Sequence, residues 1–384
     1  MNTSNNLKAA IAGAGAALLL SSTAFAGESK MAMDTPPVSP DPWDYCDLFD
    51  MGKLYKSDTG FITKFAVIGR YHGQYHWSDS NQSDLSEDWE NRRSRFGVQI
   101  GFLGDFEFEG QFNLDWDGDR FFKDVEDLYV VYEPSDDFYA IVGKVKPKIT
   151  REYSTSSKRI KTVERSQLVN QVVPDKIGGF IVGGNVTEQL FVEGAVYAGS
   201  NDDDWGLPYD GDSELAASLR VGYDITESTN VRLDYFYADG AGVDENVEEY
   251  DHILSLSTQS DWDRLHLVTD LIFASGIDDN RNSDAWSVVV MPYYDITDKL
   301  EAVLRYTYSA ADGDEGIRLQ SRYERETAAD QRGDEYHAIY GGLNYYICGD
   351  KLKLMGGVEY STLSTESAGR YKNWTVFTGV RLYF

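Results

Sequence analysis

Cysteine, proline and histidine are scarce in this 384-residue sequence, which contains 2 Cys, 9 Pro and 5 His. Two cysteines permit one disulfide at most, so a small fold held by several disulfides is excluded. The five histidines are scattered and show no metal-ligand spacing; they are His72, His76, His252, His266 and His337. The sequence also lacks a P-loop, a dinucleotide-binding fingerprint and a nucleophile motif. We therefore expect no cofactor, no metal and no catalytic residue.

Long apolar runs and positive charge are scarce as well. Beyond the amino-terminal segment, no stretch approaches the length of about 20 apolar residues that a membrane-spanning helix needs. Any membrane embedding would therefore use strands. The sequence has 35 Lys and Arg against 64 Asp and Glu, which gives a net charge of −29. Because there is no chain-wide basic surface, nucleic acid is not expected as a partner.

The amino terminus has the parts of a secretory signal. Lys8 supplies positive charge, an apolar run covers residues 9–20, and Ala24 and Ala26 are small residues at a cleavage point. We expect residues 1–26 to be removed on export to the bacterial outer membrane. Residues 27–59 contain four prolines and are predicted to form an extended periplasmic leader. No linker divides residues 60–384.

Residues 60–384 are predicted to form an all-β, transmembrane antiparallel β-barrel of about 16 strands. From Phe61 onward, alternating segments are joined by seven tight turns and eight longer polar loops. The last segment, 374–384, places Trp374 and Phe384 on one face and Arg381 on the other, and it ends on an aromatic residue, as outer-membrane barrels do. Alternation alone would also suit a soluble sheet. Export, length and strand count favour the barrel.

The most unusual stretch has a local excess of positive charge. Between residues 143 and 165, eight basic side chains face only two acidic ones, Glu152 and Glu164. The basic residues are Lys144, Lys146, Lys148, Arg151, Lys158, Arg159, Lys161 and Arg165. The two-residue period predicts that the three lysines Lys144, Lys146 and Lys148 point into the lumen, opposite an apolar lipid-facing row that includes Tyr139, Ile141 and Val145.

The residues that follow, 149–175, form the third long loop, which is expected to fold into the barrel and narrow it. Basic side chains that line a narrow passage lower the energy of an anion there and raise that of a cation. We therefore expect this stretch to contact anions. The alternative is a solvated loop that binds lipopolysaccharide outside the barrel.

Further arginines are predicted on the inward faces of other strands. Arg70, Arg93 and Arg95 are candidates for lining the anion path together with the basic stretch. A possible luminal ladder comprises Arg220, Arg232, Arg264, Arg305 and Arg381. Alternatively, luminal arginines pair with luminal acids such as Asp234 and Glu301 and brace the wall. We expect bracing for most of them and anion contact for the 144–165 cluster, where acids are too few.

The two cysteines are predicted on the same side of the membrane. Cys46 lies in the leader and Cys348 lies in a short turn. If the chain enters and leaves the barrel on the periplasmic side, a disulfide between them would pin the leader to the barrel rim. The sequence leaves a pair of free thiols equally open, because it does not give the separation of the two residues.

Three segments resemble the phosphate-selective porin O and P family. They are 69–75 (GRYHGQY), 89–97 (WENRRSRFG) and 143–166, which contains GKVKPK, EYSTSSK and VERS. The resemblance implies a sixteen-stranded barrel of the outer membrane that assembles as a homotrimer. It also implies an inward-folded third loop and basic residues that guide phosphate or related anions.

Passive diffusion of small anionic solutes is the function that these observations favour. The alternatives are a general, weakly selective porin, an outer-membrane barrel enzyme, or a structural or adhesive barrel that acts through residues 200–212 and 312–333. The expected partners are outer-membrane lipid, lipopolysaccharide and small anions.

Overall fold

The computed structural model describes residues 44–115, 121–198, 215–238, 250–276, 283–313, 315–320, 322–365 and 369–384. The predicted signal peptide, residues 1–26, lies outside the described residues, as does the leader up to residue 43. Among the helices of the described segments, none has the length and apolar character needed to cross a membrane.

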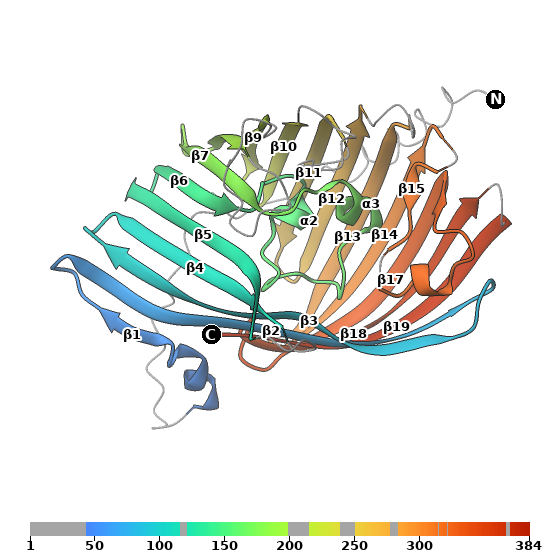
Figure 1. The fold of residues 1–384 in the computed structure, drawn as a ribbon, viewed down its shortest axis with the longest axis horizontal. Coiled ribbons are helices and arrows are strands. Elements are labelled where there is room, and N and C mark those ends of the chain that lie inside the picture. The colour runs from blue at the N-terminus through green and yellow to red at the C-terminus, as the bar shows by residue number, and fades with distance from the viewer. Residues whose placement is uncertain are drawn as a thin grey trace.

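Sixteen strands of the described chain form the wall of a closed antiparallel β-barrel (Figure 1). Closure comes from β19 and β2, which pair from Asn373 and Ser80 to Tyr383 and Arg70. The wall strands are β2 (Ile62–Ser80), β3 (Ser86–Phe102), β4 (Phe106–Leu114), β5 (Phe122–Ser135), β6 (Phe138–Val145), β7 (Ile177–Asn185), β8 (Leu190–Ala198), β9 (Leu215–Thr226), β10 (Thr229–Ala238), β11 (His252–Trp262), β12 (Leu265–Ser275), β13 (Ala285–Thr297), β14 (Leu300–Ala311), β17 (Glu335–Tyr346), β18 (Leu352–Thr365) and β19 (Gly369–Tyr383). The predicted fold class is confirmed.

The remaining elements are short and are not strands of the barrel wall. They are η1 (Tyr45–Asp50), β1 (Lys53–Lys56), α2 (Arg151–Ser154), α3 (Gln167–Val172), β15 (Ile317–Arg318), η2 (Arg325–Thr327) and β16 (Arg332–Gly333). The helices α2 and α3 both belong to the long connection between β6 and β7, and they lie inside the curve of the wall (Figure 1).

Most wall strands show the alternation that the sequence predicts. In β10, Leu233 and Tyr235 are exposed on the outside, whereas Arg232 and Asp234 are buried inside. Since successive side chains of a strand point to opposite faces, this pattern produces an apolar exterior and a polar interior. The last strand behaves in the same way, with Trp374 exposed and Arg381 fully buried.

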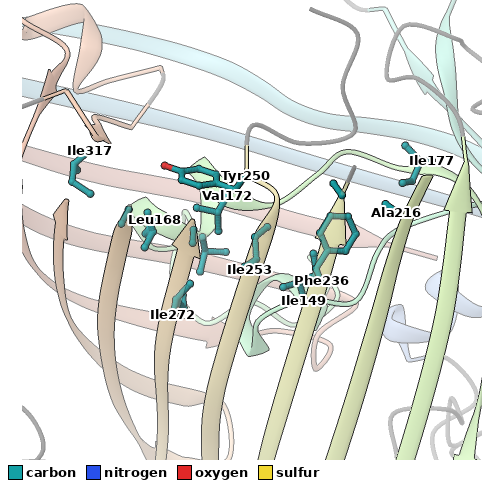
Figure 2. Close-up of a cluster of buried hydrophobic side chains, with 14 of the residues drawn as sticks. Ile149, Leu168, Val172, Ile177, Ala216, Phe236, Tyr250, Ile253, Ile272 and Ile317 are labelled. Atoms are coloured by element: carbon teal, nitrogen blue, oxygen red, sulfur yellow. The ribbon is translucent and has the colours of Figure 1, made fainter. Parts of the chain in front are cut away.

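The connection between β6 and β7 packs against the inside of the wall through an apolar core. We call residues 146–176 the inward loop. Leu168 and Val172 of α3 belong to one buried cluster with Phe236, Ile253 and Ile272 of the wall (Figure 2). Apolar contacts of this kind are favourable on both surfaces, because both leave water. The cluster therefore holds one side of the inward loop against β10, β11 and β12.

The residues before β2 are attached to the barrel at its carboxy-terminal end. A disulfide joins Cys46 of η1 to Cys348 in the turn between β17 and β18, with the two Cα atoms 5.5 Å apart. Lys351 donates hydrogen bonds of 2.7 Å to both carboxylate oxygens of Asp50. β1 then pairs with the first residues of β2. Three independent contacts thus fix this segment.

The carboxy-terminal aromatic residue fits a gap in the same region. A side chain at Gly69 would come within 2.4 Å of the Phe384 ring, and one at Gly52 within 3.2 Å of it. Only glycine leaves room for the ring at Gly69. The backbone of Phe384 also exchanges two hydrogen bonds of 3.1 Å with Gly69. The end of the chain is therefore part of the closing seam.

Candidate anion path

The prediction for the lysines at the end of β6 is wrong for Lys144. Its neighbour Gly143 pairs with the inward-facing Tyr129, and Lys144 itself pairs with Leu128. By this register Lys144 falls on the outward face with Val142, which is 56% exposed, but the side chain of Lys144 is itself buried, at 9% exposure. The apolar row that was expected to face lipid faces the interior instead, because Tyr139 and Val145 pack in the cluster that anchors the inward loop. Lys146 and Lys148 lie beyond the strand, in the inward loop.

The predicted luminal ladder is also corrected at one position. Arg264 lies in the turn between β11 and β12, is exposed, and donates to the carbonyl oxygen of Ile296. It does not belong to a strand face, because β11 ends at Trp262 and β12 begins at Leu265.

Three other arginines of the ladder lie inside and pair with acids. Arg220 and Arg232 both contact Asp234, at 3.2 and 3.0 Å. Arg305 contacts Glu359 at 3.0 Å and Glu152 of the inward loop at 3.1 Å. These arrangements agree with the alternative that luminal arginines brace the wall.

Two basic residues of the inward loop attach it to the far wall. Arg151 donates to Asn230 Oδ1 at 2.6 Å and to Ser257 Oγ at 3.1 Å, while its backbone N–H donates to Asp270. Lys161 pairs with Glu301 at 2.5 Å. The charge of Lys161 is matched by a carboxylate, whereas the Arg151 guanidinium is held by oxygens of neutral side chains; both sets of contacts hold the loop to the wall.

Six basic residues around the inward loop and the β2–β3 wall form no ion pair with a carboxylate among the described residues, as is also true of Arg159 and Arg381. We call these six the basic cluster: Arg70, Arg93, Lys146, Lys148, Lys158 and Arg165. Arg70 and Arg93 come from β2 and β3, and the other four come from the inward loop. The basic cluster therefore lies between the inward loop and the β2–β3 wall. The apolar contacts of the loop with β10, β11 and β12 are on its other side.

The side chains of the basic cluster rest on aromatic rings and neutral oxygens. Lys146 Nζ lies 4.3 Å from the centre of the Tyr153 ring, and the guanidinium of Arg165 lies 5.4 Å from the same centre. Lys158 Nζ lies 4.6 Å from the Tyr383 ring centre. Such contacts orient a cation without cancelling its charge.

Burial and mutual repulsion lower the pKa values of two lysines of the basic cluster that lie in the inward loop. Burial, together with the charges of Arg165 and Lys148, lowers the pKa of Lys146 well below its ordinary value. Burial and the nearby Arg70 lower the pKa of Lys158 to about 8. An anion that enters the cluster would favour the protonated forms, so the site gains positive charge as it binds.

Arg95 and Arg381 differ from the cluster. Arg95 pairs with Glu126 at 2.8 Å, so its charge is matched. Arg381 is fully buried and donates to Gln74 Oε1 at 2.7 Å and to the carbonyl oxygen of Val163 at 3.0 Å. It therefore fixes the inward loop to the closing seam. Arg159 is exposed and points toward the cavity below the loop.

Arg92 is a site residue that alternation did not reveal. The pairing of β2 with β3 shifts between His72, opposite Arg93, and Gly73, opposite Asn91, so that Arg92 is an extra, bulged residue. Its Nε donates to Glu164 Oε1 at 2.9 Å. Burial alone would raise the pKa of Glu164, but Arg92 and neighbouring arginines hold it well below its ordinary value. The ion pair fixes the residue next to Arg165.

A cavity of about 590 Å³ lies between the inward loop and the ends of β7 to β14. Its lining includes the loop residues Arg159 and Arg165, and acids of the short turns such as Glu188, Glu227 and Asp263. Nine acidic and six basic residues line this space, so its balance is opposite to that of the basic cluster.

No group of three or more His, Cys, Asp and Glu side chains within the described ranges is arranged to hold a metal ion.

Residues 65–244 match the phosphate-selective porin O and P family. This segment contains the basic stretch and the inward loop, so the resemblance predicted from the sequence is confirmed. No curated protein matches the chain.

Solved structures with the same barrel include several outer-membrane proteins. The outer membrane channel DcaP of Acinetobacter baumannii is 15% identical, with 86% of this chain and 99% of that chain covered and a TM-score of 0.55. For an anion-selective porin from Comamonas acidovorans the identity is 9%, the coverage 83% and 99%, and the TM-score 0.53. For the trimer form of OmpT of Vibrio cholerae the values are 14%, 83% and 99%, and 0.53.

At such low identities, these structures establish the barrel fold alone. The match to the porin family is what supports an outer-membrane porin.

Proposed function

We propose that this protein is an outer-membrane channel through which small anions diffuse without chemical change, with phosphate-like oxyanions as the preferred class. The observation that carries the proposal is the basic cluster, six cations without carboxylate partners between the inward loop and the β2–β3 wall. In a narrow passage, unmatched positive charge lowers the energy of an anion and excludes cations.

The filter that we propose differs from the one expected from the sequence. Lys146, Lys148, Lys158 and Arg165 remain in it with Arg70 and Arg93. Arg151 and Lys161 act mainly as anchors of the loop, and Lys144 lies on the outward face. Arg159 is assigned to the cavity below the loop, where an anion would leave the filter.

Single-channel recordings in planar bilayers test this function. In a salt gradient, the reversal potential should have the sign that anion permeation requires. Added phosphate should reduce the current carried by chloride more strongly than the same addition of chloride does. A pore that shows no preference between anions and cations would contradict the filter while leaving the porin intact.

A general, weakly selective porin is the second candidate. The cavity below the loop favours it, because acidic residues outnumber basic ones there by nine to six. Acidic lining attracts cations and would offset the preference set higher in the pore. The same reversal potentials separate the two candidates, since a weakly selective pore would give values near zero.

We further propose that the protein works as a homotrimer, that residues 1–26 are cleaved on export and that residues 27–59 lie in the periplasm. The trimer form of OmpT shares the barrel and supports the first point. Chemical cross-linking in native outer membranes and mass determination of the mature amino terminus test these assignments.

A further inference from the structure

A second loop lies over the inward loop. We call residues 315–320 and 322–333, which connect β14 to β17, the cap segment. Gln320 Nε2 donates to the carbonyl oxygen of Arg165 at 2.8 Å, and Gln171 Nε2 of α3 donates to that of Gly316 at 2.7 Å. Ile317 of β15 lies in the same apolar cluster as α3 (Figure 2). The cap segment therefore contacts the backbone of Arg165, a member of the basic cluster.

The other end of the cap segment reaches β2 and β3, beyond the seam where β19 pairs with β2. Ser80 Oγ of β2 donates to the carbonyl oxygen of Thr327 at 2.5 Å. Arg322 pairs with Glu90 of β3, and Ser86 donates to Glu326. The segment thus extends from α3 to the β2–β3 hairpin, above the side of the lumen that holds the basic cluster.

One carboxyl group, that of Glu324, holds the middle of the cap segment to the wall. Its side chain is fully buried. It accepts hydrogen bonds from the backbone N–H of Gln320 at 2.9 Å, from the Tyr336 hydroxyl of β17 at 3.0 Å and from Ser361 Oγ of β18. No Lys, Arg or His of the described residues forms an ion pair with it.

The neighbouring carboxylate makes an ionised Glu324 unfavourable. Glu359 of β18 already has a cation, since Arg305 of β14 contacts it at 3.0 Å, and it accepts a hydrogen bond of 3.2 Å from Tyr323. Tyr371 of β19 donates to the backbone oxygen of Glu324 and not to its carboxyl group. The wall thus presents hydroxyls and the Glu359 carboxylate to Glu324, while the one neighbouring cation named here, Arg305 of β14, is already paired with Glu359 and Glu152. A neutral carboxyl fits this environment, because hydroxyls can both accept and donate.

We propose that the cap segment is a pH-dependent gate over the basic cluster, latched by the neutral carboxyl of Glu324 and released when that carboxyl ionises. The inference rests on the proposed function, since a gate has a role only in an open pore.

The direction of the pH effect follows from linkage. Burial, and then the charge of Glu359, raise the pKa of Glu324 from 4.5 to about 7 in the closed arrangement. A released cap would expose the group to water, where its pKa returns toward 4.5. Below about pH 4.5 the protonated carboxyl therefore favours the closed form to the full extent. Between about pH 4.5 and pH 7, the ratio of closed to open channels falls about tenfold per pH unit. The whole change is about 300-fold, and it levels off above that pH.

The gate is tested on the full-length protein in planar bilayers between pH 4.5 and 8. Wild-type channels should spend less time closed as the pH rises through this range. Glu324→Gln keeps the shape and cannot ionise. Its amide oxygen can accept from the Gln320 N–H while its NH2 donates to the Tyr336 and Ser361 hydroxyls, so its closed fraction should stay high and stop depending on pH. The matched control is Glu315→Gln, which removes an exposed charge from the same segment and should behave as wild type.

A second variant gives a signature that misfolding cannot imitate. Ser361→Ala removes a hydrogen bond that favours the ionised form of Glu324, so the midpoint of closure should move to higher pH. Wild-type conductance that is constant with pH, or Glu324→Gln channels that titrate as wild type does, would overturn the gate alone. Channels that conduct at no pH would overturn the proposed function together with the gate.

Discussion

Arg93 offers the sharpest test of the proposed filter. It projects from β3, the charges of Arg92, Arg95 and Arg165 act on it and are opposed by Glu164, and it makes no hydrogen bond that holds the inward loop in the described structure. A change at this position should therefore alter the field in the pore with little effect on the position of the loop. Arg93→Gln removes one positive charge, and Arg93→Glu replaces it with a negative one.

The size of the effect can be worked out from Coulomb's law. A permeating anion in contact with the cluster is about 6 Å from the guanidinium, and a water-filled passage has an effective dielectric constant of about 40, between the values for bulk water and a protein surface. One charge then lowers the energy of an anion by about 1.4 kcal/mol and raises that of a cation by the same amount, which is about tenfold in each permeability and about a hundredfold in the anion-to-cation ratio. Arg93→Gln should reduce the ratio up to about a hundredfold, and Arg93→Glu, which changes the charge by two units, about a hundredfold more.

The assay is the reversal potential in a salt gradient at low ionic strength, because about 1 M salt shortens the screening distance to about 3 Å and would hide the effect. Arg264→Glu is the matched control, since it makes the same change of charge in an exposed turn. If Arg93→Glu shifted the reversal potential no more than Arg264→Glu, the basic cluster would not be the filter.

Three further predictions concern single residues. Because the pKa of Lys158 is lowered to about 8, its charge is present below that pH and lost above it, so anion selectivity should fall between pH 7 and 9, and Lys158→Arg should abolish this decline in the same recordings. Arg305→Ala leaves two buried carboxylates without their cation and should cost about 3–5 kcal/mol, seen as thermal unfolding in detergent at a lower temperature, whereas Arg264→Ala should stay within about 0.5 kcal/mol. Cys46→Ser should lower thermal stability by up to about 5 kcal/mol, because the bridge closes a loop of 302 residues, and reductant should remove the difference from wild type.

The barrel was predictable because its wall strands follow one simple rule. Leu233 and Tyr235 alternate with Arg232 and Asp234, and the same period continues to Trp374 and the end of the chain. Short turns and long loops also alternate along the sequence, so the strand number followed from counting them. These features depend only on local sequence and on the need to satisfy backbone hydrogen bonds in a membrane.

The candidate site was less predictable, since it depends on contacts between distant segments. Tyr139 and Val145 look like a lipid-facing row, but they pack on the inward loop, and this places Lys144 outside. The bulge at Arg92 adds a residue that strict alternation assigns to the wrong face. Nothing in the local sequence marks Glu324 as buried beside Glu359.

The Cys46–Cys348 disulfide determines whether the two fragments stay covalently joined after a single cleavage of the backbone. The chain from the leader to the turn after β17 becomes a covalent hoop, from which only β18 and β19 extend as a tail. A protease that nicks one surface loop anywhere within the hoop would leave both pieces joined, and they would separate on a denaturing gel only after reduction. After a nick between β18 and β19, the last strand would separate on that gel without reduction, because only its pairing with β18 and β2 holds it. The position of surface cleavage can therefore be assigned by comparing reduced and unreduced samples.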